Sequence, residues 1–335
     1  MRCRRLKDYV ISEVVLGCWQ LGGNLEIGRN SFGLGEVSEE EAEKIVEAAY
    51  ENYVNFFDTA DFYGLGRSER ILGKVLKKYR HNVIIATKVG FVVDGMIGVV
   101  TDFSYNHIKA SCDRSLQRLG VDCIDLYQLH CPPPTDQEEC AFEALEDLKR
   151  EGKIFYAGVS VANNFEKGAV LLKKFPFDAI QFYYNILNRG AEEILFPIIA
   201  EKKIGAIISS PFGRGVLTGK FHSLSEFSSG DSRNKWNEGG KERTYFLKQL
   251  ESYQLLSSIA KEYKMSTLEL NISYILGWEE VSVIIPGASN AKQACENARL
   301  SGSSVLNKKE IRDLRERLAC LEQERRITNE KKIRF

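Results

Sequence analysis

Four residues in the N-terminal half of the chain could together move a proton onto or off an oxygen atom. Asp58 and Tyr63 follow one run of strand-forming residues, Lys88 follows a second run, and His130 follows a third. A tyrosine has an ordinary pKa of about 10, so alone it is a poor acid or base at neutral pH. A nearby ammonium group lowers that pKa, and a carboxylate would keep the ammonium charged. A neutral histidine could orient a substrate oxygen, so the set suits protonation of a carbonyl or deprotonation of an alcohol.

Each of these residues also has an ordinary structural explanation when it is taken alone. Asp58 and Lys88 could form a structural ion pair, and Tyr63 could be packed in the core. His130 precedes three prolines and could be packed or solvated. Their shared position is more specific, because ligands of parallel α/β proteins bind at the C-terminal ends of the strands. We therefore interpret the four residues as a catalytic set.

The chain around these residues alternates between strand-like and helix-like segments. Eight apolar runs, rich in β-branched and aromatic residues, predict buried strands. These runs are 14–16, 54–57, 83–86, 123–129, 154–159, 178–182, 204–208 and 281–285. Helical patterns follow each run, and strict alternation implies parallel strands. Eight such units, with no G-x-G-x-x-G after the first strand, favour an α/β fold of the (β/α)8 TIM barrel type over an open doubly wound sheet.

The sequence predicts a single barrel domain over residues 1–322 and a charged C-terminal tail over 323–335. An extra helix is expected near 308–321, and another is expected at 191–202. Ser38 with Glu41, and Ser266 with Glu269, have the spacing of capping boxes at helix starts. The segment 209–241 is rich in Gly, Ser and charge and predicts a long loop after strand seven, which is the kind of loop that is usually functional or disordered.

Bulk composition excludes several classes of protein. The chain has 335 residues, and its 46 basic and 46 acidic residues give no net charge, which does not favour a nucleic-acid or membrane-surface partner. Its eight cysteines include no CxxC pair, and with only four histidines they show no zinc-ligand spacing. The N-terminus lacks an apolar signal region, and no apolar run reaches the length of a membrane span. We expect a cytoplasmic protein with a small-molecule substrate, no metal, no nucleic acid and no membrane.

Five segments resemble the signature sequences of the aldo-keto reductase family. They are NFFDTADFYG (55–64), IIATKVG (84–90), FSYNHIKASCDRSLQRLGVDCIDLYQLH (103–130), SSPFGRGVLTGKF (209–221) and IPGASNAKQACEN (285–297). The resemblance runs in family order from Ile11 to Ala298. It implies an NAD(P)-dependent oxidoreductase that interconverts a carbonyl (aldehyde, ketone or sugar) and an alcohol by hydride transfer.

The resemblance also implies a role for each residue of the catalytic set. Tyr63 would be the general acid in reduction and the base in oxidation. Lys88 and Asp58 would tune its pKa, and His130 would orient the carbonyl.

A cofactor site is implied along the later strand ends. Ser160 and Gln181 would hold the nicotinamide carboxamide. The other positions implied to bind cofactor are Ser209, Ser210, Phe212, Arg214, Gly287, Ser289, Lys292, Gln293, Glu296 and Asn297. Ser289 stands where many NADP-preferring members have arginine, but Lys292 could meet a 2′-phosphate as a point charge. We expect NADP, with NAD as the alternative.

The sequence departs from the family at two positions. Val161 follows Ser160 where asparagine is usual, so one hydrogen bond to the carboxamide is lost unless Asn163 supplies it. Ser209 stands where the family often has an aromatic residue that stacks on the nicotinamide. Either another residue covers that ring or the ring is held less tightly.

Two tryptophans are the candidates for substrate contact. Trp19 follows the first strand and either faces the substrate or packs against the loop after it. Trp236 lies in the long loop and is either a lid or simply exposed. An apolar wall with a few polar anchors suits many aldehydes, ketones and sugars.

Two rival functions remain open from the sequence. A cofactor-neutral sugar dehydratase or epimerase using bound NAD(P) would consume no net cofactor. A non-enzymatic NADP-binding partner subunit would form a stable complex with a membrane protein. The oligomeric state also stays open.

Overall fold

Eight parallel strands form the centre of the protein. The computed structural model describes residues 1–28, 30–221, 227 and 231–333, and side chains as far as Cys320. The barrel strands, in chain order and with neighbours paired, are β3 (Leu16–Gly17), β6 (Phe56–Asp58), β7 (Ile84–Val89), β10 (Ile124–Leu129), β11 (Ile154–Ala162), β12 (Ala179–Tyr183), β13 (Gly205–Ser209) and β14 (Val281–Ile284). This order confirms the predicted (β/α)8 barrel.

The first and last strands close the barrel. Parallel bridges join Val14 to Ile284 and Gly17 to Gly287. The Val15 N–H donates to the Ile284 carbonyl, and the Gly17 N–H donates to the Pro286 carbonyl, each at 3.0 Å. A side chain at Gly17 would come within 2.8 Å of the Ile285 carbonyl oxygen, so the closing contact requires glycine there.

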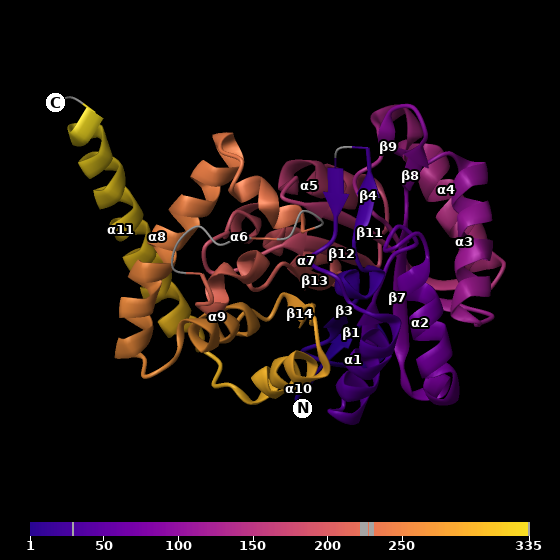
Figure 1. Cartoon of the computed structure of the whole chain (residues 1–335), viewed down its shortest axis with the longest axis horizontal. Coiled ribbons are helices and arrows are strands. Elements are labelled where there is room, and N and C mark those ends of the chain that lie inside the picture. The colour runs from indigo at the N-terminus through magenta and orange to yellow at the C-terminus, as the bar shows by residue number, and fades with distance from the viewer. Residues whose placement is uncertain (29, 222–226, 228–230, 334–335) are drawn as a thin grey trace.

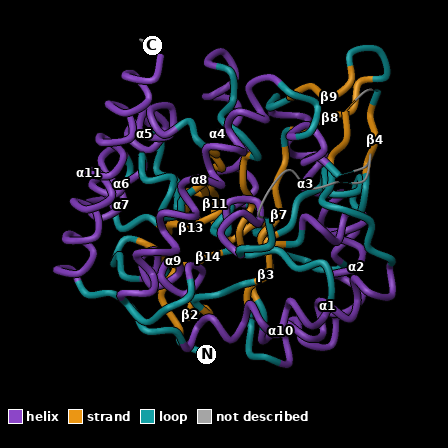
Figure 2. The backbone as a smooth tube through the Cα atoms, turned by 60° about the vertical axis from the view of Figure 1, so that its left-hand side comes forward, coloured by secondary structure: helices purple, strands orange, loops and turns teal. Residues whose placement is uncertain are grey.

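Helices surround the strands on the outside (Figures 1 and 2). They are α1 (Glu39–Glu51), α2 (Arg67–Leu76), α3 (Tyr105–Leu119), α4 (Glu138–Arg150), α5 (Phe165–Lys174), α6 (Ala191–Ile194), α7 (Phe196–Lys202), α8 (Gly240–Glu262), α9 (Thr267–Leu276), α10 (Ala291–Arg299) and α11 (Lys308–Ile333). Their buried faces join the strands in one core, as at Ile45 of α1 and Leu145 of α4.

Two of the expected helices differ in the structure, and the long segment after β13 contains short helices. The single helix expected at 191–202 is two, α6 and α7, and Pro197 lies in the first turn of α7, where its missing N–H is tolerated. The predicted end of the barrel domain at 322 falls inside α11, which continues as helix to Ile333. The long segment 209–241 contains the 3-10 helices Gly213–Thr218 and Ser232–Trp236, while its residues 222–226 and 228–230 lie outside the described part of the chain.

Three short antiparallel hairpins, which the sequence did not predict, cover the two ends of the barrel. The hairpin of β1 (Cys3–Leu6) and β2 (Tyr9–Ser12) contacts β13 and β14. At the other end lie the hairpins of β4 (Leu25–Ile27) with β5 (Asn30–Phe32), and of β8 (Phe91–Asp94) with β9 (Gly98–Thr101). In Figure 1 the first hairpin is at the bottom and the other two are at the top. No helix in the part of the chain described by the structure is long and apolar enough to cross a membrane.

Candidate active site

The four predicted catalytic residues meet at one end of the barrel. Asp58 ends β6, Lys88 lies in β7, and His130 follows β10 directly. Tyr63 lies in the turn between β6 and α2. Parallel strands point their C-terminal ends to the same face of a barrel, and this places residues far apart in sequence side by side.

Asp58 and Lys88 form a buried ion pair with a bond of 2.5 Å between Nζ and Oδ1. The ammonium also donates to the Thr59 carbonyl at 2.8 Å. Burial alone would lower the pKa of Lys88, but Asp58 and Tyr63 outweigh burial and raise it. Lys88 is therefore a permanent cation in the barrel interior.

The second oxygen of Asp58 accepts from two glutamine amides. Gln128 Nε2 donates to Oδ2 at 3.1 Å and Gln181 Nε2 donates to it at 2.9 Å. Gln128 belongs to the site although the sequence did not single it out. Gln128 lies in β10 directly opposite Lys88 of β7 in the parallel register, and this position brings its side chain to Asp58.

Tyr63 lies against both Lys88 and His130. Lys88 Nζ is 5.2 Å from the centre of the phenol ring, and the Tyr63 and His130 rings meet edge to face at 5.5 Å. Burial raises the pKa of Tyr63 to about 12, even though Lys88 acts to lower it. The expected direction of the Lys88 effect holds, but burial is the larger effect in this structure.

His130 is held as a neutral imidazole. Burial, and then the charge of Lys88, lower its pKa well below its ordinary value. Its Nδ1 atom is buried and has no hydrogen-bond partner within the described residues. The Phe91 ring of β8 packs on the His130 ring with 4.7 Å between their centres. The β8–β9 hairpin, which the sequence did not predict, therefore covers this side of the site.

The predicted carboxamide and stacking positions lie on three adjacent strands. Ser160 pairs with Gln181 across β11 and β12, and Tyr183 pairs with Ser209 across β12 and β13. Val161 is buried, and the Asn163 side chain accepts from Asn188 at 2.8 Å. This contact uses one acceptor site of the Asn163 amide and leaves its N–H donors for another partner.

The turn after β13 brings Ser210, Phe212 and Arg214 to the same rim. Ser210 and Arg214 have positive φ angles of 53° and 56°, which bend the chain back on itself. Arg214 donates to Ser232 at 3.0 Å, while its buried Nε atom has no partner among the residues that the structure describes. Burial lowers its pKa, and its guanidinium lies 5.2 Å from the centre of the Trp236 ring.

The two substrate candidates differ in exposure. Trp236 is 2% exposed and stacks on Phe246 at 4.2 Å, so the expectation that it could be simply exposed is wrong. Trp19 begins a 3-10 helix, Trp19–Gly22, and is partly exposed after β3. Substrate contact by Trp19 and Trp236 stays a prediction.

The remaining cofactor candidates form one segment at the start of α10. Asn297 donates to the Gly287 carbonyl at 3.0 Å, and the Gln293 side chain accepts from the Ser289 N–H at 2.9 Å. Lys292 and Glu296 are exposed and lie 3.9 Å apart. A helix N-terminus with an exposed lysine suits the anionic part of a nucleotide.

A cavity of about 280 Å³ opens between the ends of β11 and β12, the turn after β13, and α8. Its walls include Asn163, Tyr183, Asn185, Arg214, Tyr245 and Gln249. The α8 wall could not be predicted from the sequence, because that contact depends on how the long segment folds back.

The residues present fit a nicotinamide nucleotide. Ser209 Oγ and Arg214 Nε, which have no hydrogen-bond partner in the described part of the chain, are polar groups that a ligand could satisfy. The glycine-rich turn at Gly213 and Gly215 leaves the backbone accessible to a diphosphate. Within the described residues, no cluster of three or more His, Cys, Asp or Glu side chains could hold a metal ion.

Comparisons with known proteins show the family to which the chain belongs. The sequence model of the Aldo/keto reductase family matches residues 13–319. The chain is 34% identical over 319 residues to the uncharacterized oxidoreductase YqkF of Bacillus subtilis (strain 168), covering 94% of this chain and 95% of that protein. It is 31% identical over 304 residues to aldo-keto reductase yakc of Schizosaccharomyces pombe, whose name specifies NADP(+), covering 86% and 87% of the two chains.

Among solved structures, the holo form of aldo-keto reductase AKR11C1 from Bacillus halodurans matches with a TM-score of 0.76 and 30% identity, covering 94% of this chain and 96% of that chain. The matches of sequence and fold extend over nearly the whole chain. The protein belongs to the aldo-keto reductase family.

Proposed function

We propose that the protein reduces aldehydes, ketones or sugars with NADPH and that Tyr63 is the proton donor. Family membership makes the chain an NAD(P)-dependent oxidoreductase of carbonyl compounds. The observation that carries the finer proposal is the buried Asp58–Lys88 pair beside the ring of Tyr63, at the barrel end where His130 is neutral.

The protonation states suit a reduction. The pKa of Tyr63, about 12, keeps the phenol protonated at neutral pH, so it can give a proton to a carbonyl oxygen. Lys88 then stabilises the phenolate that this transfer leaves. His130 can donate a ring N–H to the same oxygen and so orient the carbonyl. A bound nicotinamide would supply the hydride.

The cofactor groove is proposed along the later strand ends. Gln181 gives its amide nitrogen to Asp58, which leaves its carbonyl oxygen to accept from the carboxamide N–H, with Ser160 beside it. The turn at 210–214 would hold the diphosphate. Lys292 would read a 2′-phosphate, and the name of the yakc relative supports NADP as the preferred cofactor.

Tyr63→Phe tests the proton donor. The variant lacks the donated proton, so its turnover should fall by about 100-fold or more while its affinity for NADPH stays unchanged. The measurement is NADPH oxidation with a panel of aldehydes, ketones and sugars, together with a fluorescence titration of cofactor. Tyr53→Phe is the control, because Tyr53 is 79% exposed. A Tyr63→Phe enzyme that keeps most of its rate would remove Tyr63 from this role.

The same assay distinguishes the proposal from cofactor-neutral chemistry. A carbonyl reductase oxidises one NADPH for each alcohol formed. Product formation without net oxidation of NADPH would contradict the proposal. Parallel titration with NADH measures the cofactor preference directly.

A further inference from the structure

Tyr183 is an exposed aromatic side chain at the mouth of the barrel. It ends β12 and is 40% exposed. Two residues earlier, Gln181 points into the barrel, since its amide donates to Asp58. Side chains alternate along a strand, so Tyr183 points to the same side, one layer nearer the mouth. Phe182, between them, packs outward against Phe165.

The neighbour of Tyr183 in this layer is too small to cover a ring. Tyr183 pairs with Ser209 across the parallel strands β12 and β13. Registered residues on adjacent strands point to the same face, so the two side chains lie next to each other. Ser209 is buried, and its hydroxyl has no partner among the described residues.

Tyr183 also lies between the proposed proton donor and the proposed diphosphate site. It is close enough to Tyr63 to act on the pKa of that phenol, and close enough to Arg214 to act on the pKa of that guanidinium. It lines the same cavity as Arg214. A nicotinamide that reaches Tyr63 while its diphosphate rests on the turn at 210–214 must pass this position.

We propose that Tyr183 provides the aromatic face against which the nicotinamide ring packs. This positioning role rests on the proposed function. Flat aromatic rings prefer offset stacking on another ring, and Tyr183 is an uncovered ring in the layer above Gln181. Tyr183 on β12 therefore supplies the aromatic ring that Ser209 on β13 lacks, and the nicotinamide keeps a stacking partner.

The test compares Tyr183→Ala with Tyr183→Phe. Removing the ring should weaken NADPH binding by about tenfold, because an aromatic pair contributes this order of free energy. Phenylalanine keeps the ring and should bind NADPH as the wild type does. Affinity for 2′-phospho-ADP-ribose, which lacks the nicotinamide, should be the same in all three proteins. Fluorescence titration measures each affinity.

A second variant uses the pairing of the two strands. In the Tyr183→Ala protein, Ser209→Tyr should restore NADPH affinity, because it returns a ring to the same layer from the neighbouring strand. Tyr183 is exposed at a strand end, so the Ala and Phe variants are expected to fold. If the double variant does not fold, the comparison of these two single variants still tests the stacking role.

The outcomes separate this inference from the proposed function. If the wild type binds NADPH and Tyr183→Ala binds it equally well, the stacking role is overturned and the reductase proposal stands. Equal weakening of NADPH and 2′-phospho-ADP-ribose also overturns the stacking role, because the loss would then lie elsewhere in the groove. A wild type that binds neither nucleotide overturns both.

Discussion

At the scale of single residues, the site combines a charged interior with neutral hydrogen-bonding groups. The Asp58 carboxylate accepts from Lys88, Gln128 and Gln181, so β7, β10 and β12 are each joined to β6 through this one group. Burying a charge is costly unless it is paired and hydrogen-bonded. These contacts explain how the barrel keeps a cation beside Tyr63 with no exposed surface.

A half-buried carboxyl group, that of Asp61, lies next to this set and is not used in the proposed chemistry. Burial, and then the charge of Glu69, raise its pKa to about 7, while Arg118 and Arg114 act in the opposite direction. Glu69 itself accepts from Arg118 and from Thr87. The Oδ1 atom of Asp61 is buried without a partner in the described structure.

Asp61 is predicted to make stability depend on pH. Its ordinary pKa is 3.8, so between 3.8 and about 7 the folded protein holds a proton that the unfolded chain has released. Stability therefore falls as pH rises through this window. Asp61→Asn keeps the neutral shape, so it should raise the melting temperature more at about pH 8 than at about pH 5. Thermal melts at both values measure this.

The control for this experiment is Asp136→Asn, at an exposed position. The difference between variant and wild type should be the same at both pH values for that control. An Asp61→Asn protein with an equal shift at both values would show that the carboxyl does not titrate in the predicted window.

At the scale of elements, local sequence patterns predicted the first residues of helices correctly. They did not predict every contact that the capping side chains make. Ser266 and Glu269 form the full reciprocal capping box at α9. At α1 the Ser38 side chain accepts from the Glu41 N–H, but the Glu41 side chain accepts from Ala291 of α10 instead of closing the box. Sequence spacing cannot reveal this choice, because the competing donor is distant in the chain.

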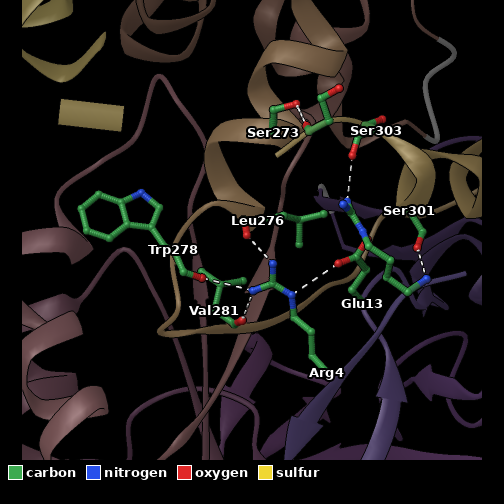
Figure 3. A network of polar contacts seen from close by, with 10 residues as sticks. Arg4, Glu13, Ser273, Leu276, Trp278, Val281, Ser301 and Ser303 are labelled. Atoms are coloured by element: carbon green, nitrogen blue, oxygen red, sulfur yellow. Dashed lines mark hydrogen bonds and ion pairs between the residues drawn. The ribbon is translucent and has the colours of Figure 1, made fainter. Parts of the chain in front are cut away.

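The N-terminal hairpin is held by a polar network that no local pattern indicates (Figure 3). Glu13 is buried and pairs with Arg2 at 2.7 Å and with Arg4 at 3.4 Å. Arg4 also donates to the carbonyls of Leu276, Trp278 and Val281, so it joins β1 to the end of α9 and the start of β14. The network fixes the hairpin at the end of the barrel away from the active site.

Glu13→Ala should destabilise the protein by about 2–3 kcal/mol. Breaking a buried ion pair leaves uncompensated charge, and the cost is reduced here because both arginines are partly exposed. Urea unfolding measures the change. Glu40→Ala is the control, because the Glu40–Lys44 pair is exposed and its loss should change stability far less than the loss of Glu13. Equal effects of the two substitutions would contradict a structural role for the network.

At the scale of the whole molecule, the strand count and the strand ends were enough to predict the barrel and the end of it at which Asp58, Tyr63, Lys88 and His130 meet. The prediction succeeded because all eight strands are parallel and a closed barrel gathers their C-terminal ends. The cavity wall from α8, the hairpins and the length of α11 could not be predicted, because they depend on packing between distant segments. Phe91 on His130 is one such contact.

The last helix is predicted to stabilise the barrel through its first half alone. Ile311, Leu314 and Leu318 are buried, and Arg315 pairs with Glu192 at 2.7 Å. Glu192 in turn accepts from the hydroxyl groups of Tyr184 and Tyr274, so α11 is connected to α6, α9 and the end of β12. In Figure 1 the later turns of α11 project beyond α8.

Two truncations test this division of the helix. A chain ending at Cys320 should keep the melting temperature of the full protein. A chain ending at Leu306 should melt at a much lower temperature, because each lost apolar side chain contributes about 2 kcal/mol. In addition, Glu192 loses its ion pair with Arg315. Thermal melts measure both. A large loss of stability in the longer truncated chain would show that the projecting turns contribute to the fold, and the boundary at 322 would then have no structural meaning.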